Sequence, residues 1–292
     1  MQYKISLENE MKIRDYLLSL HLGKPKIHDL FQYKLVSING KIANPFSIIK
    51  DNDLLEIIYD EDINYLPFHY KLDILYEDDY LLVINKPVGF MVHPDEINKD
   101  KTVCNMIANY YTYNNIKANV RYVHRIDTET SGILIFAKDM LTEAYFNYHF
   151  ALHDFKREYL ALVHQVPLPD KGIIDAKIGS DRHDKQRRRV SKTGVEARTY
   201  YEVLKSYNKY SLVKLVLQTG RTHQIRVHMR YLGYPLLGDE LYGGSKKYID
   251  RVALHSYRFT YIDPYSLKEN SICCPLPMDM KKLLKGEENV IW

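Results

Sequence analysis

The segment His124-Arg125-Ile126-Asp127-Thr128-Glu129-Thr130-Ser131-Gly132 is a polar turn that runs directly into the apolar stretch Ile133-Leu134-Ile135-Phe136-Ala137. The β-branched and aromatic residues of that stretch are typical of a buried strand. Asp, Thr, Ser and Gly favour tight turns, so the polar segment lies where the strand begins. We therefore predict that a sheet presents Asp127 and Arg125 from one of its ends.

A second polar turn occurs later in the chain and is rich in hydrogen-bond donors. It reads Gly220-Arg221-Thr222-His223-Gln224-Ile225-Arg226-Val227-His228 and follows the strand-like run Val213-Lys214-Leu215-Val216-Leu217. One turn follows a strand and the other precedes one, so both can meet at the same end of a sheet. The first then supplies an anion, and the second supplies a cation that can hold it.

Length and composition describe an ordinary globular protein. The chain has 292 residues, of which 46% are hydrophobic and 27% are charged, and its net charge is +4. No apolar run approaches the roughly 18 residues that span a membrane, and the N-terminus lacks the apolar core of a signal peptide, so we expect a cytoplasmic protein. Cys104, Cys273 and Cys274 have neither the number nor the spacing of a disulfide framework or a zinc site.

Two regions with different patterns follow one another along the chain. Residues 11–60 combine a predicted helix (Met11 to Leu20) with strands around the turn Asn39-Gly40, which is a strong hairpin signal. The polar run Asp60-Glu61-Asp62 then suggests a linker. From about Leu72 short strands alternate with turns, with helices predicted at Leu141 to His153 and Thr222 to Tyr231. This order predicts an α+β protein built on a mixed, largely antiparallel sheet.

The two polar motifs, in this order and at this spacing, resemble the signature segments of the RluA-type RNA pseudouridine synthases. The first region, with Arg14 and Val36-Ser37-Ile38-Asn39-Gly40-Lys41, resembles the small S4 RNA-binding domain. The resemblance implies an S4-like α+β domain over residues 1–62 and a catalytic domain of the pseudouridine synthase type over residues 63–292.

The resemblance also implies a reaction and its catalytic residues. In pseudouridine formation the bond from uridine N1 to C1′ breaks, the base turns, and C5 joins C1′, without any cofactor. Asp127 is then the catalytic aspartate, and Arg221 is the arginine that holds it by a planar two-point contact. Tyr159, in the strand Glu158-Tyr159-Leu160-Ala161-Leu162-Val163, is expected to stack on the target base and to handle the C5 proton.

Extrusion of a uridine from RNA costs a few kcal/mol, and the family resemblance assigns Arg125 to the gap that the base leaves. A simple phosphate contact is the alternative for this arginine. The basic run Arg187-Arg188-Arg189 is expected on a hairpin that faces the RNA backbone, and by itself it would be read as a solvated loop. We predict RNA contacts by a set of side chains from these three motifs: Arg125, His124, Thr130, His223, Gln224, Arg226, Arg187, Arg188 and Arg189.

Other functions fit the sequence less well. A glycoside hydrolase needs carboxylates on both sides of the bond, whereas Glu129 lies in the same turn as Asp127. A zinc deaminase needs H-x-E and P-C-x-x-C, which are absent, and His149 and His153 lack the H-E-x-x-H context of a metal site. The remaining alternative is an RNA-binding or ribosome-assembly factor without catalysis. We expect a monomer that acts on ribosomal RNA rather than transfer RNA and needs no membrane or obligate protein partner.

Overall fold

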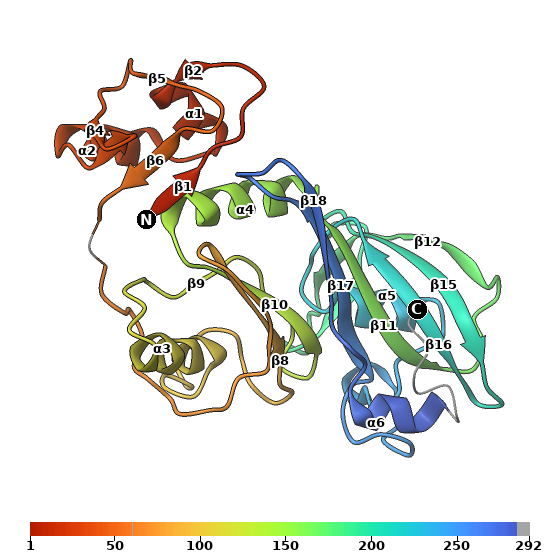
Figure 1. Cartoon of the computed structure of the whole chain (residues 1–292). Helices are drawn as coiled ribbons and strands as arrows, with labels where there is room; N and C mark the ends of the chain where they lie inside the picture. The colour runs from red at the N-terminus through yellow and green to blue at the C-terminus, as the bar shows by residue number, and fades with distance from the viewer. Residues whose placement is uncertain (60, 285–292) are drawn as a thin grey trace.

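The computed structural model describes residues 1–59 and 61–284 (Figure 1), so Asp60 of the predicted linker and the last residues of the catalytic domain lie outside the described residues. A small N-terminal unit lies beside a large twisted sheet that carries helices on both of its faces. No helix in the described ranges is long and apolar enough to cross a membrane.

The N-terminal unit has a four-stranded antiparallel sheet and two helices. Its elements are β1 (Gln2–Lys4), β2 (Met11–Lys12), α1 (Ile13–Ser19), α2 (Lys24–Gln32), β3 (Val36–Ile38), β4 (Lys41–Ile42), β5 (Ile48–Ile49) and β6 (Leu54–Ile57). Asn39 and Gly40 have φ of 51° and 75°, which confirms the predicted hairpin turn between β3 and β4. The predicted helix at Met11 begins two residues late, because Met11 and Lys12 pair with Ile49 and Ile48.

A mixed sheet of ten strands forms the centre of the rest of the described chain. In spatial order its main path is β12 (Lys171–Asp175), β15 (Arg198–Ser206), β16 (Tyr210–Leu217), β11 (Lys156–His164), β17 (Leu254–Ile262), β10 (Ser131–Ala137), β8 (Leu81–Lys86) and β7 (Ile74–Glu77), with β9 (Arg121–Tyr122) on β10 and β18 (Glu269–Cys273) on β17. Only β10 and β17 pair in parallel among these strands. The prediction of a mixed, largely antiparallel α+β fold is therefore confirmed.

Helices cover the sheet because side chains alternate between its two faces. They are α3 (Val103–Tyr113), α4 (Met140–Leu152), α5 (Gln224–Tyr231) and α6 (Met278–Lys281), with 3₁₀ turns at Glu240–Tyr242 and Lys282–Leu284. Leu134 and Phe136 of β10 pack against α3, whereas Ile133 and Ile135 pack with Phe146 of α4. The helices at α4 and α5 were predicted. A separate two-stranded hairpin, β13 (Ile178–Ser180) with β14 (Arg188–Val190), carries the basic run.

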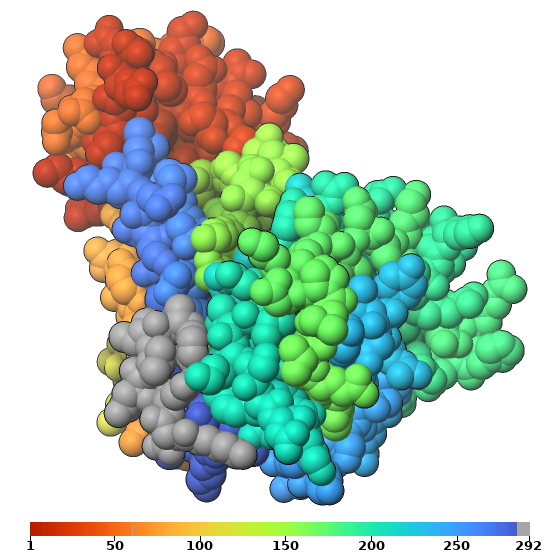
Figure 2. All heavy atoms as spheres, turned by 90° about the vertical axis from the view of Figure 1, so that its right-hand side faces the viewer, coloured from red at the N-terminus to blue at the C-terminus, as the bar shows by residue number. Residues whose placement is uncertain are grey.

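The N-terminal unit shares its hydrophobic core with the larger part of the chain. Tyr3 is completely buried, and its ring lies 5.3 Å from that of Tyr80 and 5.0 Å from that of Tyr265. Met140 and Leu141 of α4 belong to the same cluster. Figure 2 shows the blue turn between β17 and β18 lying against the red N-terminal unit, where Ser6 N donates to Tyr265 O. The boundary at residue 62 stays a prediction, and hydrophobic packing is continuous across it.

We expect Tyr3→Ala to destabilise both parts of the chain together. Removing a buried aromatic ring costs about 3–5 kcal/mol, so the unfolding free energy should fall by that order in one transition. Tyr33→Ala is the matched control, because Tyr33 is 66% exposed in the same unit and should change stability by less than about 0.5 kcal/mol. Denaturant unfolding followed by circular dichroism measures both. An early separate transition, with the main one unmoved, would contradict a shared core.

Candidate active site

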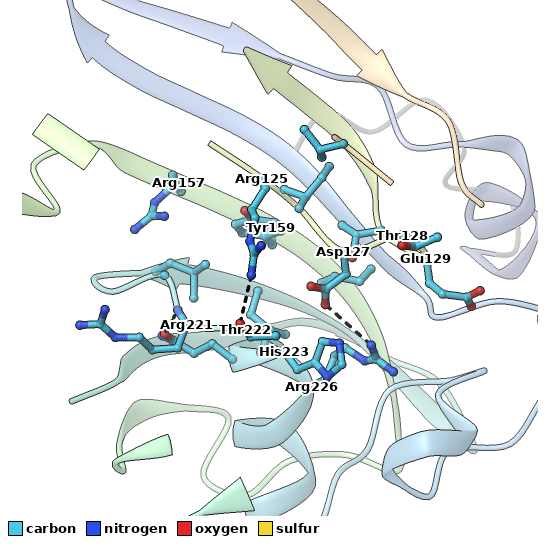
Figure 3. Close-up of a pocket in the computed structure, with 18 of the residues that line it drawn as sticks. Arg125, Asp127, Thr128, Glu129, Arg157, Tyr159, Arg221, Thr222, His223 and Arg226 are labelled. Atoms are coloured by element: carbon cyan, nitrogen blue, oxygen red, sulfur yellow. Dashed lines mark hydrogen bonds and ion pairs between the residues drawn. The ribbon is translucent and has the colours of Figure 1, made fainter. Parts of the chain in front are cut away.

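A cavity of about 390 Å³ opens where the two polar motifs meet. Figure 3 shows Asp127 and Arg125 on one side of it, Arg221, Thr222, His223 and Arg226 on the other, and Tyr159 of β11 between them. The Asp127 turn comes directly before β10, and the Arg221 turn lies between β16 and α5. The prediction that both turns meet at one end of a sheet is therefore confirmed.

Close strand packing and a buried lysine hold the turn that carries Asp127 in place. Gly132 has φ of 106°, and a Cβ there would lie 2.2 Å from the carbonyl oxygen of Ser256 on the parallel strand β17, so only glycine lets the strands approach. The fully buried Lys86 ammonium donates to Thr128 O at 3.1 Å and also to the carbonyls of Pro87 and Phe90. Burial lowers the pKa of Lys86 to about 7. These contacts leave the turn little freedom.

Arg226 is the cation that faces Asp127. Its Nη1 lies 3.7 Å from Asp127 Oδ2, and its Nε and Nη2 both donate to the fully buried carboxylate of Asp239 at 2.8 Å. The predicted pairing of Asp127 with Arg221 is wrong, because the Arg221 side chain extends along the turn and donates from Nε to Glu196 O at 2.9 Å. Arg221 precedes α5, whereas Arg226 lies within it and points into the pocket (Figure 3).

Four of the side chains predicted to contact RNA make close contacts within the protein. Arg226 is occupied by the two carboxylates, and Thr130 is only 2% exposed. The Gln224 amide is saturated, since it accepts from Thr219 Oγ1 and Arg221 N and donates to Arg198 O and Thr199 Oγ1. His124 stacks on Phe150, and its Nε2 accepts from Ile135 N at 3.2 Å. These contacts hold the site together, and contact of the four side chains with RNA stays a prediction.

The other predicted RNA contacts lie at the pocket or beside it. Arg125 is exposed and reaches across the opening to Thr222 Oγ1 at 3.4 Å. His223 lines the pocket, and its Nδ1 lies 2.9 Å from the hydroxyl of Tyr242. The same hydroxyl accepts from Arg188 N, which anchors the β13 to β14 hairpin with Arg187, Arg188 and Arg189 next to the site. Contact of these residues with RNA stays a prediction.

Tyr159 is buried and forms part of the pocket wall. Burial raises the pKa of its phenol, so this side chain is neutral at physiological pH. Arg157 lies two residues earlier on β11 and also lines the pocket, because side chains two apart on a strand share a face. Arg157, Lys86 and Asp239 were not predicted as site residues from the sequence. Because side chains on a strand alternate between its two faces, the position of Arg157 two residues before Tyr159 was a signal that could have identified it.

Within residues 1–59 and 61–284, no three His, Cys, Asp or Glu side chains come together in a way that could hold a metal ion. His149 and His153, the pair at helical spacing, lie at the end of α4 and do not line the pocket. His149 Nδ1 instead contacts the carboxylate of Asp154 at 3.0 Å.

Comparison with known proteins shows which family has a similar sequence. Residues 80–231 match the family model described as RNA pseudouridylate synthase. The chain is 38% identical over 288 residues to the uncharacterized RNA pseudouridine synthase YhcT of Bacillus subtilis, covering 96% of this chain and 95% of that protein. It is 33% identical to ribosomal large subunit pseudouridine synthase D of Xylella fastidiosa, covering 85% and 80% of the two chains.

A solved structure has a similar fold. Human RNA pseudouridylate synthase domain containing 4 superposes with a TM-score of 0.61 at 28% sequence identity, over 73% of this chain and 92% of that one.

Acid should destabilise the site through His124. Burial lowers the pKa of His124 from 6.5 to about 3. Below about pH 6.5 His124 is therefore protonated in the unfolded chain, whereas it stays neutral in the folded chain. The stability tied to neutral His124 is present above that pH and is lost as pH falls. Between about pH 7 and pH 4.5 the wild type should therefore lose about 2–3 kcal/mol more than His124→Gln. Denaturant unfolding at both pH values measures this, and parallel losses would refute it.

Proposed function

Because this chain belongs to the RNA pseudouridylate synthase family and is an RNA pseudouridine synthase, we propose that it flips uridines out of ribosomal RNA and isomerises them with Asp127 as the catalytic carboxylate. The observation that carries this proposal is the ion pair of Asp127 with Arg226 inside the cavity. Relatives named ribosomal large subunit pseudouridine synthase D support ribosomal RNA as the substrate class.

The geometry at Asp127 suits a reacting carboxylate. Its side chain keeps 25% of its surface exposed to the cavity, and the 3.7 Å separation from Arg226 leaves its oxygens free to approach a sugar. Arg226 cannot move closer without giving up its two-point contact with Asp239. A cation held near a carboxylate, without capping it, orients the carboxylate and leaves its oxygens open to the substrate. Glu129, the other carboxylate of the lining, is exposed at the rim.

The reaction is an isomerisation, so atoms balance within the nucleotide. The N1 to C1′ bond breaks, C5 bonds to C1′, the hydrogen on C5 leaves as a proton, and N1 gains one. Tyr159 packs against the turned base with its buried ring and, as a neutral phenol, relays the C5 proton. Ile126 and Leu254 complete an apolar wall that excludes water from the base.

In this proposal Arg125 moves when the base is flipped. At rest its guanidinium bridges the pocket to Thr222 through a long 3.4 Å hydrogen bond, which is weak and easily given up. When the uridine enters, Arg125 swings into the vacated stack, where a planar guanidinium can both stack and hydrogen-bond. The exposed position of Arg125 at the pocket rim supports this role.

Two surfaces outside the pocket bind the RNA backbone in this proposal. One is the hairpin with Arg187, Arg188 and Arg189. Figure 2 shows the part of the chain near residue 185 projecting from the side of the molecule. The other is the S4-like unit over residues 1–62. Basic side chains on both neutralise phosphates. In this proposal the protein acts as a monomer.

Asp127→Asn should abolish pseudouridine formation and leave RNA affinity nearly unchanged. The amide keeps the size and turn preference of aspartate but cannot act as an anion, so a rate loss of at least about a thousandfold is expected, or about 4 kcal/mol. The measurement is tritium release from an unmodified transcript of large-subunit ribosomal RNA labelled at uridine C5. Glu129→Gln, a matched change in the same turn, separates this role from a two-carboxylate hydrolase. Turnover by the Asn variant within tenfold of wild type would exclude Asp127, and a wild type without turnover would favour the pure RNA-binding factor.

The two arginines of the second motif should differ in their effects. Arg226→Lys replaces a planar fork by a point charge and cannot contact Asp239 at two points while facing Asp127, so the single-turnover rate at saturating RNA should fall by about a hundredfold or more. Arg221→Lys keeps its charge outside the Asp127 pair and should leave that rate within about threefold. Melting temperatures check folding. Equal rate losses for the Arg226→Lys and Arg221→Lys variants would show that Arg221 also acts on Asp127.

A further inference from the structure

Arg157 is a pocket residue without an anionic partner. Its Nε and Nη2 are buried and have no hydrogen-bond partner within the described residues. Its neighbours on β11 differ in this respect, because the Glu158 carboxylate lies 2.7 Å from Lys156 Nζ on the opposite face of the strand. Buried guanidinium groups are normally paired, since an uncompensated buried charge costs several kcal/mol. Its guanidinium lies over the ring of Phe150, 5.6 Å from the ring centroid, but this contact leaves the hydrogen-bonding capacity of Nε and Nη2 unused.

The surroundings of Arg157 add positive charge rather than remove it. Burial, and then the nearby Arg221, govern the lowered pKa of Arg157, although the phenol of Tyr159 opposes this. Burial also lowers the pKa of His153, with Arg157 and Arg221 acting in the same direction, and its Nδ1 is likewise buried without a partner. The nearby Asp154 carboxylate contacts His149 instead. Three donor-bearing side chains thus converge without a carboxylate among them.

The backbone makes room for this arrangement. A Cβ on Gly220 would lie 2.7 Å from Arg157 Nη1, so the glycine before Arg221 lets the Arg157 guanidinium lie against the turn. Figure 3 shows Arg157 and Arg221 together at the end of the pocket away from Glu129. The pocket is therefore polarised: carboxylates lie at one end, and unneutralised arginines lie at the other.

We propose that Arg157 and Arg221 form a subsite for a phosphodiester of the RNA strand next to the uridine held at Asp127. This inference rests on the proposed function. A phosphate offers several acceptor oxygens to two guanidinium forks, and it is the only anionic group of RNA. The carboxylates at the opposite end repel phosphate, so the charge pattern sets the direction in which the strand lies across the pocket. Free phosphate has the same chemistry and is distinguished below.

The test compares Arg157→Met with Lys156→Met. Both changes remove one cation from adjacent positions of β11, but Lys156 is exposed and faces away from the pocket. Binding to the ribosomal RNA transcript is measured over a range of salt. Arg157→Met should weaken binding about tenfold or more and reduce the slope of log K against log salt by roughly 0.7–0.9. Lys156→Met should leave the slope unchanged. Equal slopes for Arg157→Met and wild type overturn the subsite.

Stability separates this role from a structural one. Methionine fills the stem volume of arginine and removes an unpaired buried charge, so the melting temperature of Arg157→Met without RNA should equal or exceed that of wild type. Should this variant fail to fold, Arg157→Gln carries the same salt-slope test.

Inorganic phosphate and turnover complete the experiment. If phosphate raises the melting temperature of wild type but not of Arg157→Met while their RNA salt slopes agree, the site binds free anion and the RNA assignment is wrong. Tritium release by wild type is measured in parallel. Absence of turnover would count against the proposed function alone, because the slope comparison needs only binding.

Discussion

The site depends on one buried contact, the two-point hydrogen bond between Arg226 and Asp239. Asp239 has a fully buried carboxylate, and it holds two of the guanidinium nitrogens at 2.8 Å. This leaves only Nη1 of Arg226 to face Asp127, at a distance where it stabilises the charge without capping the oxygens. From the other side, Lys86 fixes the turn that carries Asp127. Two rigid supports thus fix the position of the Asp127 carboxylate.

The same pocket contains a buried positive charge that lowers the stability of the fold and is not needed to form it. Nε and Nη2 of Arg157 are buried without hydrogen-bond partners among the residues that the structure describes, and replacing such a group by an apolar one is often neutral or stabilising. Retaining it next to Tyr159 makes sense when the missing anion arrives with the substrate. The Arg226 to Asp239 pair is compensated and acts in the empty site, whereas Arg157 and Arg221 act when RNA is bound. Support and recognition are therefore divided between different arginines of one pocket.

Local signals allowed the sequence to predict much of this arrangement. The Asp127 turn before an apolar strand, the helix at Leu141 and the Asn39-Gly40 hairpin each follow from adjacent residues. The choice between Arg221 and Arg226 does not, because it depends on where α5 begins and on Asp239, which lies in a later segment. Helix α3 was not predicted, although Val103, Met106, Ile107, Tyr110 and Tyr111 recur at helical spacing after the capping residue Thr102, so a local signal for it was present.

The shared core also bears on how a uridine is chosen. Strand β10 runs from the Asp127 turn to Asp139, whose buried carboxylate accepts from Leu141 N and Thr142 N and so caps α4. Thr142 Oγ1 lies 2.8 Å from the hydroxyl of Tyr265, which packs on Tyr3 of the N-terminal unit. A tethered module would only raise the local concentration of RNA. A module packed through this chain of contacts holds its surface at a fixed distance from Asp127, so an RNA that binds both places, as we propose, would be selected by its shape.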